Sequence, residues 1–302
     1  MSIFDKILSD SILPPVLYHY TSPKCFAKIV ESGYLYAANI RYIKNDISFS
    51  YTIEMVREEI KRQIQSLKRL LKKEAHTDDV PGKKIRLLNG LIKRLASLEQ
   101  FHIFIISFSQ DSDLSSSWQD YCPGGIGLSI GFDTERLAYL AKRQGFKLVG
   151  CSHNKAEQEK IVNALVSESI EKIKTDSNNA SEWLLTLNTT VDEFALKTIQ
   201  LTAMFKHPSC SEKSEWRLFS MPVPILPTNS SIRFRGGESM LVPYLEFMLA
   251  DKKNATPLIK KIIVGPTPDK KLSHNSLELF MSVNALKSCT IHYSQLPYSE
   301  SI

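Results

Sequence analysis

The sequence LYHYTS at residues 17–22, followed by IVESGYLYA at residues 29–37, predicts the core of the fold. Aromatic and β-branched residues are frequent in both stretches, which is typical of β-strands. A helix-length segment and the turn-forming Gly33 lie between them. We therefore expect two strands joined by a helical segment, with His19 at the centre of the first strand and Tyr34 and Tyr36 in the second.

The rest of the chain interleaves further predicted strands with long predicted helices. Strands are expected at 101–109, 124–132, 146–151, 215–219, 232–234, 242–248, 260–264 and 290–293. Helices are expected at 155–175 and 181–205, and Asp133 can cap a short helix that ends near residue 142. This order predicts an α+β fold. We expect one domain over residues 1–302, with helical insertions at 50–98 and 155–205.

The insertion at 50–98 has the pattern of a basic antiparallel helical hairpin. Apolar residues recur at steps of three and four in both halves, and residues 78–82 form a turn between them. Residues 57–99 hold 12 Lys and Arg against 6 Asp and Glu, so this segment carries the entire net charge of +6. Two interpretations remain open: a solvated hairpin packed on the protein, or an arm that binds a phosphate backbone or an acidic partner. The candidate nucleic-acid-binding residues are Lys68, Arg69, Lys72 and Lys73.

Composition sets limits on the class of protein. The 302 residues are 43% hydrophobic and 23% charged, as in a soluble globular protein. No apolar run reaches the ~20 residues that span a bilayer, and the N-terminus lacks the pattern of a signal peptide. The five cysteines are scattered without a CxxC pair. We expect a cytoplasmic protein with reduced thiols, no metal site and no membrane association.

Several polar and aromatic residues are candidates for a binding site. The hydroxyls of Tyr18, Tyr20 and Thr21 surround His19, which is otherwise interpreted as a core histidine. Alternation along a strand places Tyr34 and Tyr36 on one face, either as an aromatic wall or as core residues.

Later in the chain, Ser107 ends an apolar strand, and Trp118 and Tyr121 share one face of a helical turn. These two aromatic side chains either contact a flat ring of a ligand or serve as packing residues of an ordinary loop. Glu215 is the best candidate carboxylate, because a glutamate entering an apolar strand needs a partner or a task. Arg217 lies on the same face, so a purely structural salt bridge is the alternative.

Taken together, these motifs resemble a bacterial domain-of-unknown-function family, number 2971, nearly end to end outside the two helical insertions. The resemblance rests on LYHYTS (17–22), Asn45-Asp46, SFS (107–109) with Trp118 and Tyr121, GLSIGFD (127–133), FKHP (205–208), EKSEWR (212–217), VPY (242–244), KKIIVGP (260–266) and SQLPY (294–298).

The first two predicted strands separately resemble the diphtheria-toxin-like branch of ADP-ribosyltransferases. In that branch a histidine of the first strand binds NAD, tyrosines frame the nicotinamide and a late glutamate is catalytic. The resemblance implies that His19 binds NAD, that Tyr34 or Tyr36 faces nicotinamide and that Glu215 is catalytic. It also implies an ADP-ribosyltransferase-like split β-sheet core.

The function implied is transfer of ADP-ribose from NAD to a nucleic acid (RNA or DNA) or protein acceptor, in a bacterial toxin or phage-defence effector with a possible antitoxin or neutralising partner. The basic hairpin favours a nucleic acid. NAD is then a substrate, and the expected NAD-binding residues are His19, Tyr20, Thr21, Tyr34, Tyr36, Ser107, Trp118 and Tyr121. Two alternatives are an NAD glycohydrolase and a non-catalytic binding module on the same fold.

Overall fold

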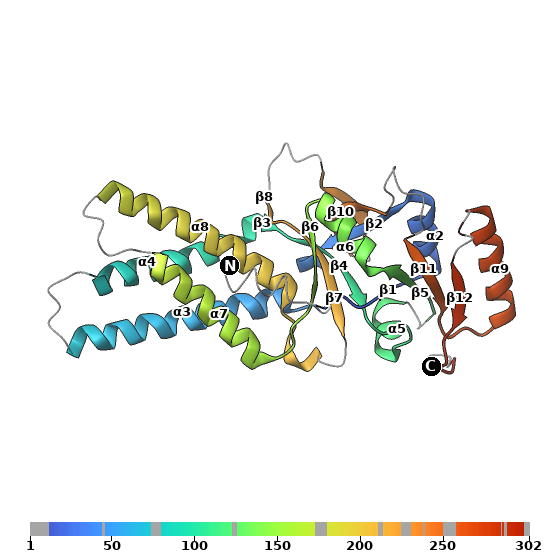
Figure 1. Cartoon of the computed structure of the whole chain (residues 1–302), viewed down its shortest axis with the longest axis horizontal. Helices are drawn as coiled ribbons and strands as arrows, with labels where there is room; N and C mark the ends of the chain where they lie inside the picture. Colours follow the sequence, from blue (N-terminus) through green and yellow to red (C-terminus); the bar gives the residue numbers. More distant parts are fainter. Residues whose placement is uncertain are drawn as a thin grey trace.

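The structure is a computed structural model with an elongated α+β architecture (Figure 1). A mixed, mostly antiparallel sheet occupies the centre, four long helices lie at one end and helix α9 lies at the other. The structure describes residues 12–43, 46–73, 80–122, 126–172, 180–210, 214–224, 231–237, 239–249, 258–284, 286 and 289–298.

Ten strands of the described residues form the central sheet. The order is β12-β11-β5-β1-β4-β2-β10-β9, and β7 lies between β4 and β6. The pairs are antiparallel except for β11 with β12. The strands are β1 (Val16–Thr21), β2 (Tyr34–Asn39), β4 (Phe104–Ser109), β5 (Leu128–Asp133), β6 (Phe146–Gly150), β7 (Glu215–Ser220), β9 (Arg233–Gly236), β10 (Leu241–Met248), β11 (Ile259–Val264) and β12 (Thr290–Tyr293). Two short strands, β3 (Phe101–His102) and β8 (Val223–Pro224), pair separately.

The sheet divides at strand β4. Strand β7 pairs with β4 along residues 105–109. Two different strands pair with β4 elsewhere: β1 meets it at Ser109, and β2 meets it at Phe104 and Ile105. Neither β1 nor β2 is in register with residues 106–108. The sheet therefore opens beside Ser107, between the divergent strands β1 and β2.

Alternation along β4 and β7 gives one apolar face and one face on which polar side chains lie beside Ile105 and Phe219. On one face, Phe104, Ile106 and Phe108 of β4 join Trp216 and Leu218 of β7 in a hydrophobic core. The residues between them in each strand face the other side of the sheet. That side carries Ser107 and Ser109 of β4 and Glu215 and Arg217 of β7. The polar face is the one on which the site is built.

The four long helices are α3 (Ser48–Lys73), α4 (Val80–Ala96), α7 (Lys155–Lys172) and α8 (Ala180–Met204). They pack together around a second core that includes Ile60, Leu88 and Phe194 and reaches the sheet at Ile105 and Phe219. The predicted hairpin at 50–98 is thus α3 and α4, and the predicted insertion at 155–205 is α7 and α8. The two insertions form one helical bundle, which the sequence patterns did not indicate.

Shorter helices cover the remaining sheet. They are α2 (Pro23–Ser32), α5 (Ser115–Tyr121), α6 (Thr134–Arg143), α9 (Lys270–Val283) and the 3-10 helices Ile40–Tyr42, Leu98–Gln100 and Pro208–Cys210. Ser22 caps the start of α2, and Gly33 ends it with φ 71°, a conformation that favours glycine. Asp133 caps α6 as predicted. No helix within the described ranges is long and apolar enough to cross a membrane.

Candidate active site

A cavity of about 180 Å³ lies where β1 and β2 separate from β4. Residues from β1, β2, β4, α5, β7 and β9 line it. Six of the predicted site residues share it: His19, Tyr20, Tyr36, Ser107, Tyr121 and Glu215. These residues span almost 200 positions of sequence, and the sheet brings them to one place.

His19 bridges the opening in the sheet. Its Nδ1 lies 3.0 Å from the carbonyl oxygen of Ser107. Ser107 belongs to the stretch of β4 that is in register with neither β1 nor β2. Because a carbonyl only accepts, Nδ1 carries the proton. Burial lowers the pKa of His19, so the ring is neutral near pH 7. A neutral ring protonated on Nδ1 leaves Nε2 as an acceptor, suited to a hydroxyl donor such as a ribose.

Two of the four tyrosines that line the cavity, Tyr20 and Tyr36, have different surroundings. Tyr20 donates from its hydroxyl to the carbonyl of Asp111 at 2.7 Å and accepts from the amide of Leu114 at 2.9 Å. Tyr36 is 37% exposed and stacks on Tyr244 with centroids 4.5 Å apart. Tyr36 therefore presents an accessible ring at the cavity, whereas the hydroxyl of Tyr20 is committed to the loop after β4.

Three predicted NAD-binding residues lie elsewhere. Trp118 is 2% exposed, packs edge-on against Tyr20 and donates its indole N–H to Asp113 at 2.8 Å, so it is a core residue. Thr21 is buried at the end of β1 and does not line the cavity. Tyr34 lines a different cavity, near Gln144 and Met248. Tyr34 and Tyr36 are two residues apart in β2 and were therefore expected on one face of the strand, but their side chains line separate cavities.

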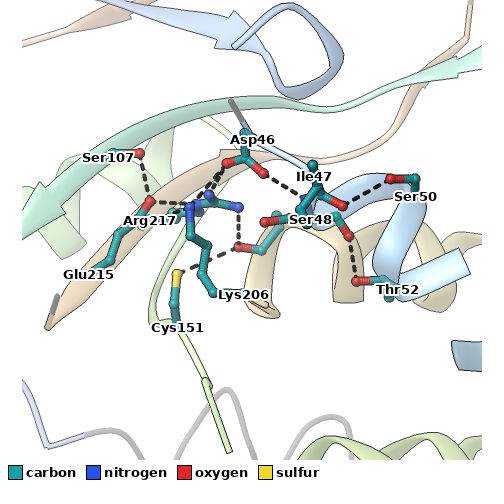
Figure 2. A network of polar contacts seen from close by, with 11 residues as sticks. Asp46, Ile47, Ser48, Ser50, Thr52, Ser107, Cys151, Lys206, Glu215 and Arg217 are labelled. Atoms are coloured by element: carbon teal, nitrogen blue, oxygen red, sulfur yellow. Dashed lines mark hydrogen bonds and ion pairs between the residues drawn. The ribbon is translucent and has the colours of Figure 1, made fainter. Parts of the chain in front are cut away.

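Glu215 belongs to a buried network of charges (Figure 2). Its Oε1 accepts from the Ser107 hydroxyl and from Nε of Arg217, both at 2.8 Å. Its Oε2 lies 3.1 Å from the ammonium of Lys206. Asp46 pairs with both cations: Lys206 at 3.3 Å, and Arg217 through its Nη2. The salt bridge between Glu215 and Arg217 considered from the sequence is thus present as part of a larger set.

The network holds its carboxylates in the charged form. Burial alone would raise the pKa of Glu215, but Arg217 and Lys206 outweigh it and hold this pKa at about 2. The same two cations overcome burial at Asp46 and hold its pKa at about 2. Burial, followed by the charge of Glu215, raises the pKa of Tyr121, which therefore stays protonated. The cavity is therefore lined by Glu215 as an ionised carboxylate and by Tyr121 as a neutral phenol.

Three residues of the site had no predicted role. Asp46 and Lys206 lie within motifs that carried the family resemblance, but neither motif showed that the two residues meet. Arg235 of β9 reaches the cavity from a strand whose residues are all exposed. Its only sequence signal is the basic pair in Arg233-Phe234-Arg235, which is common on exposed strands.

Other candidate groups lie outside this arrangement. Residues 124 and 125 of the strand expected at 124–132 fall outside the described residues, and strand β5 begins at Leu128. Burial raises the pKa of Cys151 to about 12, which makes its thiol a poor nucleophile beside His153. Among the described residues, no group of three or more His, Cys, Asp or Glu side chains could hold a metal ion.

The predicted nucleic-acid-binding residues lie far from the cavity. Lys68, Arg69 and Lys72 are exposed near the end of α3, whereas the side chain of Lys73 lies outside the described part. Asp46 stands just before α3 begins at Ser48. At 1.5 Å per residue, the basic end of α3 is roughly 30 Å from this start. The bundle thus has a base in the site and a basic tip remote from it.

Comparison with known proteins bears on the family alone. No curated protein and no solved structure matches this chain. Residues 117–218, from α5 to β7, match the model of the family described as "Protein of unknown function (DUF2971)". The matched segment contains Tyr121, Lys206, Glu215 and Arg217 of the site. This match supports the domain-of-unknown-function family 2971 that the motifs predicted.

Proposed function

We propose that this protein is an NAD-dependent ADP-ribosyltransferase. The observation that supports it is the meeting of His19, Tyr36, Ser107 and Glu215, from β1, β2, β4 and β7, around one cavity where the sheet opens. The resemblance had implied an NAD-binding histidine, a tyrosine at nicotinamide and a late catalytic glutamate at a split sheet. The proposal extends to an ADP-ribosyltransferase-like fold.

The reaction breaks the bond between nicotinamide and ribose. Nicotinamide leaves with the bonding electron pair, and positive charge develops on C1′ and the ring oxygen of the ribose, as in glycoside hydrolysis. An ionised Glu215 stabilises that charge and accepts a hydrogen bond from the 2′-hydroxyl. A lone pair of the acceptor then forms the new bond to C1′, and the acceptor loses its proton. The cationic leaving group needs no general acid.

The cavity has the size of one end of NAD. Its volume of about 180 Å³ is below the ~300 Å³ at which sites begin to enclose whole ligands. We assign it to nicotinamide and its ribose, with His19 at a ribose hydroxyl and Tyr36 against the nicotinamide ring. The exposed Arg235 is then placed to pair with the pyrophosphate, which a guanidinium binds well.

The acceptor is a nucleic acid or a protein, and the exposed cations near the end of α3 favour RNA or DNA. An acceptor that touches both this tip and the cavity must span roughly 30 Å, as an extended nucleic acid does. A bacterial toxin or phage-defence effector with a neutralising protein partner fits such an activity.

A non-catalytic binding module is the second candidate. The observation that favours it is the position of Glu215, which has a cation against each of its carboxylate oxygens. Such a carboxylate can serve structure alone, because a buried cation left without its partner strongly destabilises a fold. The basic bundle would then be the working surface.

One experiment separates these functions. The purified protein is incubated with NAD labelled in the adenylate moiety and with total cellular RNA, DNA and protein, in parallel with Glu215→Gln. Labelled acceptor indicates the transferase, and free labelled ADP-ribose without labelled acceptor indicates a glycohydrolase. Intact NAD in every reaction, with a folded wild-type protein, contradicts both enzymatic functions and supports the binding module.

A further inference from the structure

We propose that Lys206 is a positioning residue for Glu215, so that the base of the helical bundle completes the active site. This proposal deepens the NAD chemistry above and rests on it. Lys206 follows the last residue of α8, Met204, by two positions, and its side chain is 12% exposed. It carries charge into a site whose predicted residues come from the sheet and α5.

The two carboxylate oxygens of Glu215 make different contacts. Oε1 is committed, because it accepts from Ser107 and from Arg217. Oε2 is buried and accepts no hydrogen bond from the described residues, although the ammonium of Lys206 lies 3.1 Å away. Among the described residues, Lys206 is therefore the cation that faces Oε2, and it sets the charge and direction of the carboxylate that acts on the ribose.

Contacts from the bundle fix Lys206 itself. Its backbone amide donates to the carbonyl of Ser152 at 3.0 Å, and its own carbonyl accepts from the side-chain amide of Gln158 at 2.9 Å. Gln158 is fully buried on α7. Asp46, just ahead of α3, lies 3.3 Å from the ammonium and accepts from the amide of Ser48 at 2.8 Å. Gln158 of α7 and segments next to α3, α7 and α8 thus locate one charge.

The charge of Lys206 also helps to keep Glu215 ionised. Burial raises the pKa of Glu215, and Arg217 and then Lys206 lower it. Removing one of the two cations raises this pKa while Arg217 still opposes protonation. The titratable or charged side chains that interact electrostatically with Glu215 are Tyr121, Cys151, His153, Lys206 and Arg217. Asp46 pairs with the two cations of this set.

The test compares Lys206→Met, Lys206→Arg and wild type. Methionine keeps an unbranched apolar chain and removes the charge, whereas arginine keeps the charge. We expect Lys206→Met to lower kcat for NAD cleavage by about 10- to 100-fold with little change in KM, since misplacement of a reacting group is costly. The acidic limb of its pH–kcat profile moves to higher pH, and Lys206→Arg restores much of the rate. Lys197→Met is the matched control, since Lys197 of α8 pairs with Glu168 on the bundle surface.

Several outcomes overturn the proposal. An unchanged pH profile in Lys206→Met, together with lower stability only, makes Lys206 structural. A higher kcat in Lys206→Met would show that Lys206 restrains Glu215 in a less active position. The pKa of Glu215, followed by NMR of its ¹³C-labelled carboxyl group, gives a readout independent of activity. If wild type consumes no NAD, the proposed function fails, whereas a carboxyl pKa that does not rise in Lys206→Met refutes the role of Lys206 even in an active enzyme.

Discussion

Glu215 and Glu59 are both about 4% exposed and both pair with arginine, but only Glu215 lines the cavity. This difference gives a matched test at the scale of the residue. Glu215→Gln keeps an oxygen that accepts from Ser107 and Arg217 and loses the charge needed at the transition state. We expect kcat to fall at least ~100-fold, or about 2.7 kcal/mol, with NAD affinity nearly intact. Steady-state kinetics on the folded protein measures it.

The network adds a cost in stability to this variant. Removing one member of a buried ion pair costs about 3–5 kcal/mol, and Gln recovers part of it through its hydrogen bonds. Glu59→Gln, made in the bundle away from the cavity, also removes the charge of a buried glutamate but leaves NAD turnover unchanged. Equal turnover in Glu215→Gln and wild type would end the catalytic assignment of Glu215.

His19 supplies a second prediction for a single residue. His19→Ala removes the bond to the Ser107 carbonyl and the acceptor Nε2 that we assign to a ribose hydroxyl. Loss of a hydrogen bond in a buried site costs about 1–3 kcal/mol, so we expect NAD binding to weaken by roughly 5- to 150-fold. Titration calorimetry measures this change. A folded variant with wild-type NAD affinity would remove His19 from the site.

At the scale of the element, we expect the two ends of the helical bundle to have different roles. Its base contributes Asp46 and Lys206 to the network around Glu215, and its tip bears exposed cations near the end of α3. Lys68→Gln combined with Lys72→Gln therefore acts on the tip alone. If both lysines contact phosphates of a single-stranded acceptor, the log–log dependence of binding on salt should flatten by about 1.4. Electrophoretic mobility shifts at several salt concentrations measure it.

The matched control neutralises two exposed lysines at the opposite end of the molecule, Lys270 and Lys271 of α9. We expect that double variant to keep the wild-type salt dependence. NAD hydrolysis to water should be unaffected by the tip variant, because the tip is roughly 30 Å from the base. Equal loss of hydrolysis and of nucleic-acid transfer would instead assign the tip a structural role.

At the scale of the whole molecule, the buried network predicts how stability depends on pH. The pKa of Glu215 is about 2 in the folded protein against an ordinary 4.5, and that of Asp46 is about 2 against 3.8. Below pH 4.5 the unfolded chain therefore binds protons that the folded protein does not. The stabilisation is complete above about pH 4.5 and is lost as the pH falls towards 2.

For Glu215 alone this loss is on the order of 3 kcal/mol. Urea unfolding of wild type at pH 6 and pH 3 measures about 2 kcal/mol of it, because the loss is complete only below pH 2. The Glu215→Gln variant, which has no carboxyl group at this position, should show a smaller difference between the two pH values. A wild-type free energy of unfolding that is equal at pH 6 and pH 3 would contradict the low carboxyl pKa values.

The local patterns of this sequence are informative about elements. Apolar, aromatic and β-branched runs around His19, Ser107 and Glu215 predicted strands β1, β4 and β7, and steps of three and four predicted the helical hairpin α3–α4. The helical pattern succeeds because burial of one face imposes its period on neighbouring residues. The α+β class follows from the order of the elements, and the candidate carboxylate follows from the rarity of an unpaired glutamate in an apolar strand.

Tertiary structure decided which of these residues meet. Alternation along a strand predicts which face a side chain lies on but not which residues it contacts, so it could not separate Tyr36 from Tyr34. The spacing of Trp118 and Tyr121 likewise could not show that Trp118 packs in the core. Asp46 and Lys206 are 160 positions apart, and no local period links them. Their contact arises because the bundle packs against the polar face of β4 and β7, which brings the start of α3 and the end of α8 together there. The sequence by itself determined the elements and a candidate carboxylate, whereas long-range strand pairing and helix packing decided what surrounds that carboxylate, since such contacts depend on the whole chain at once.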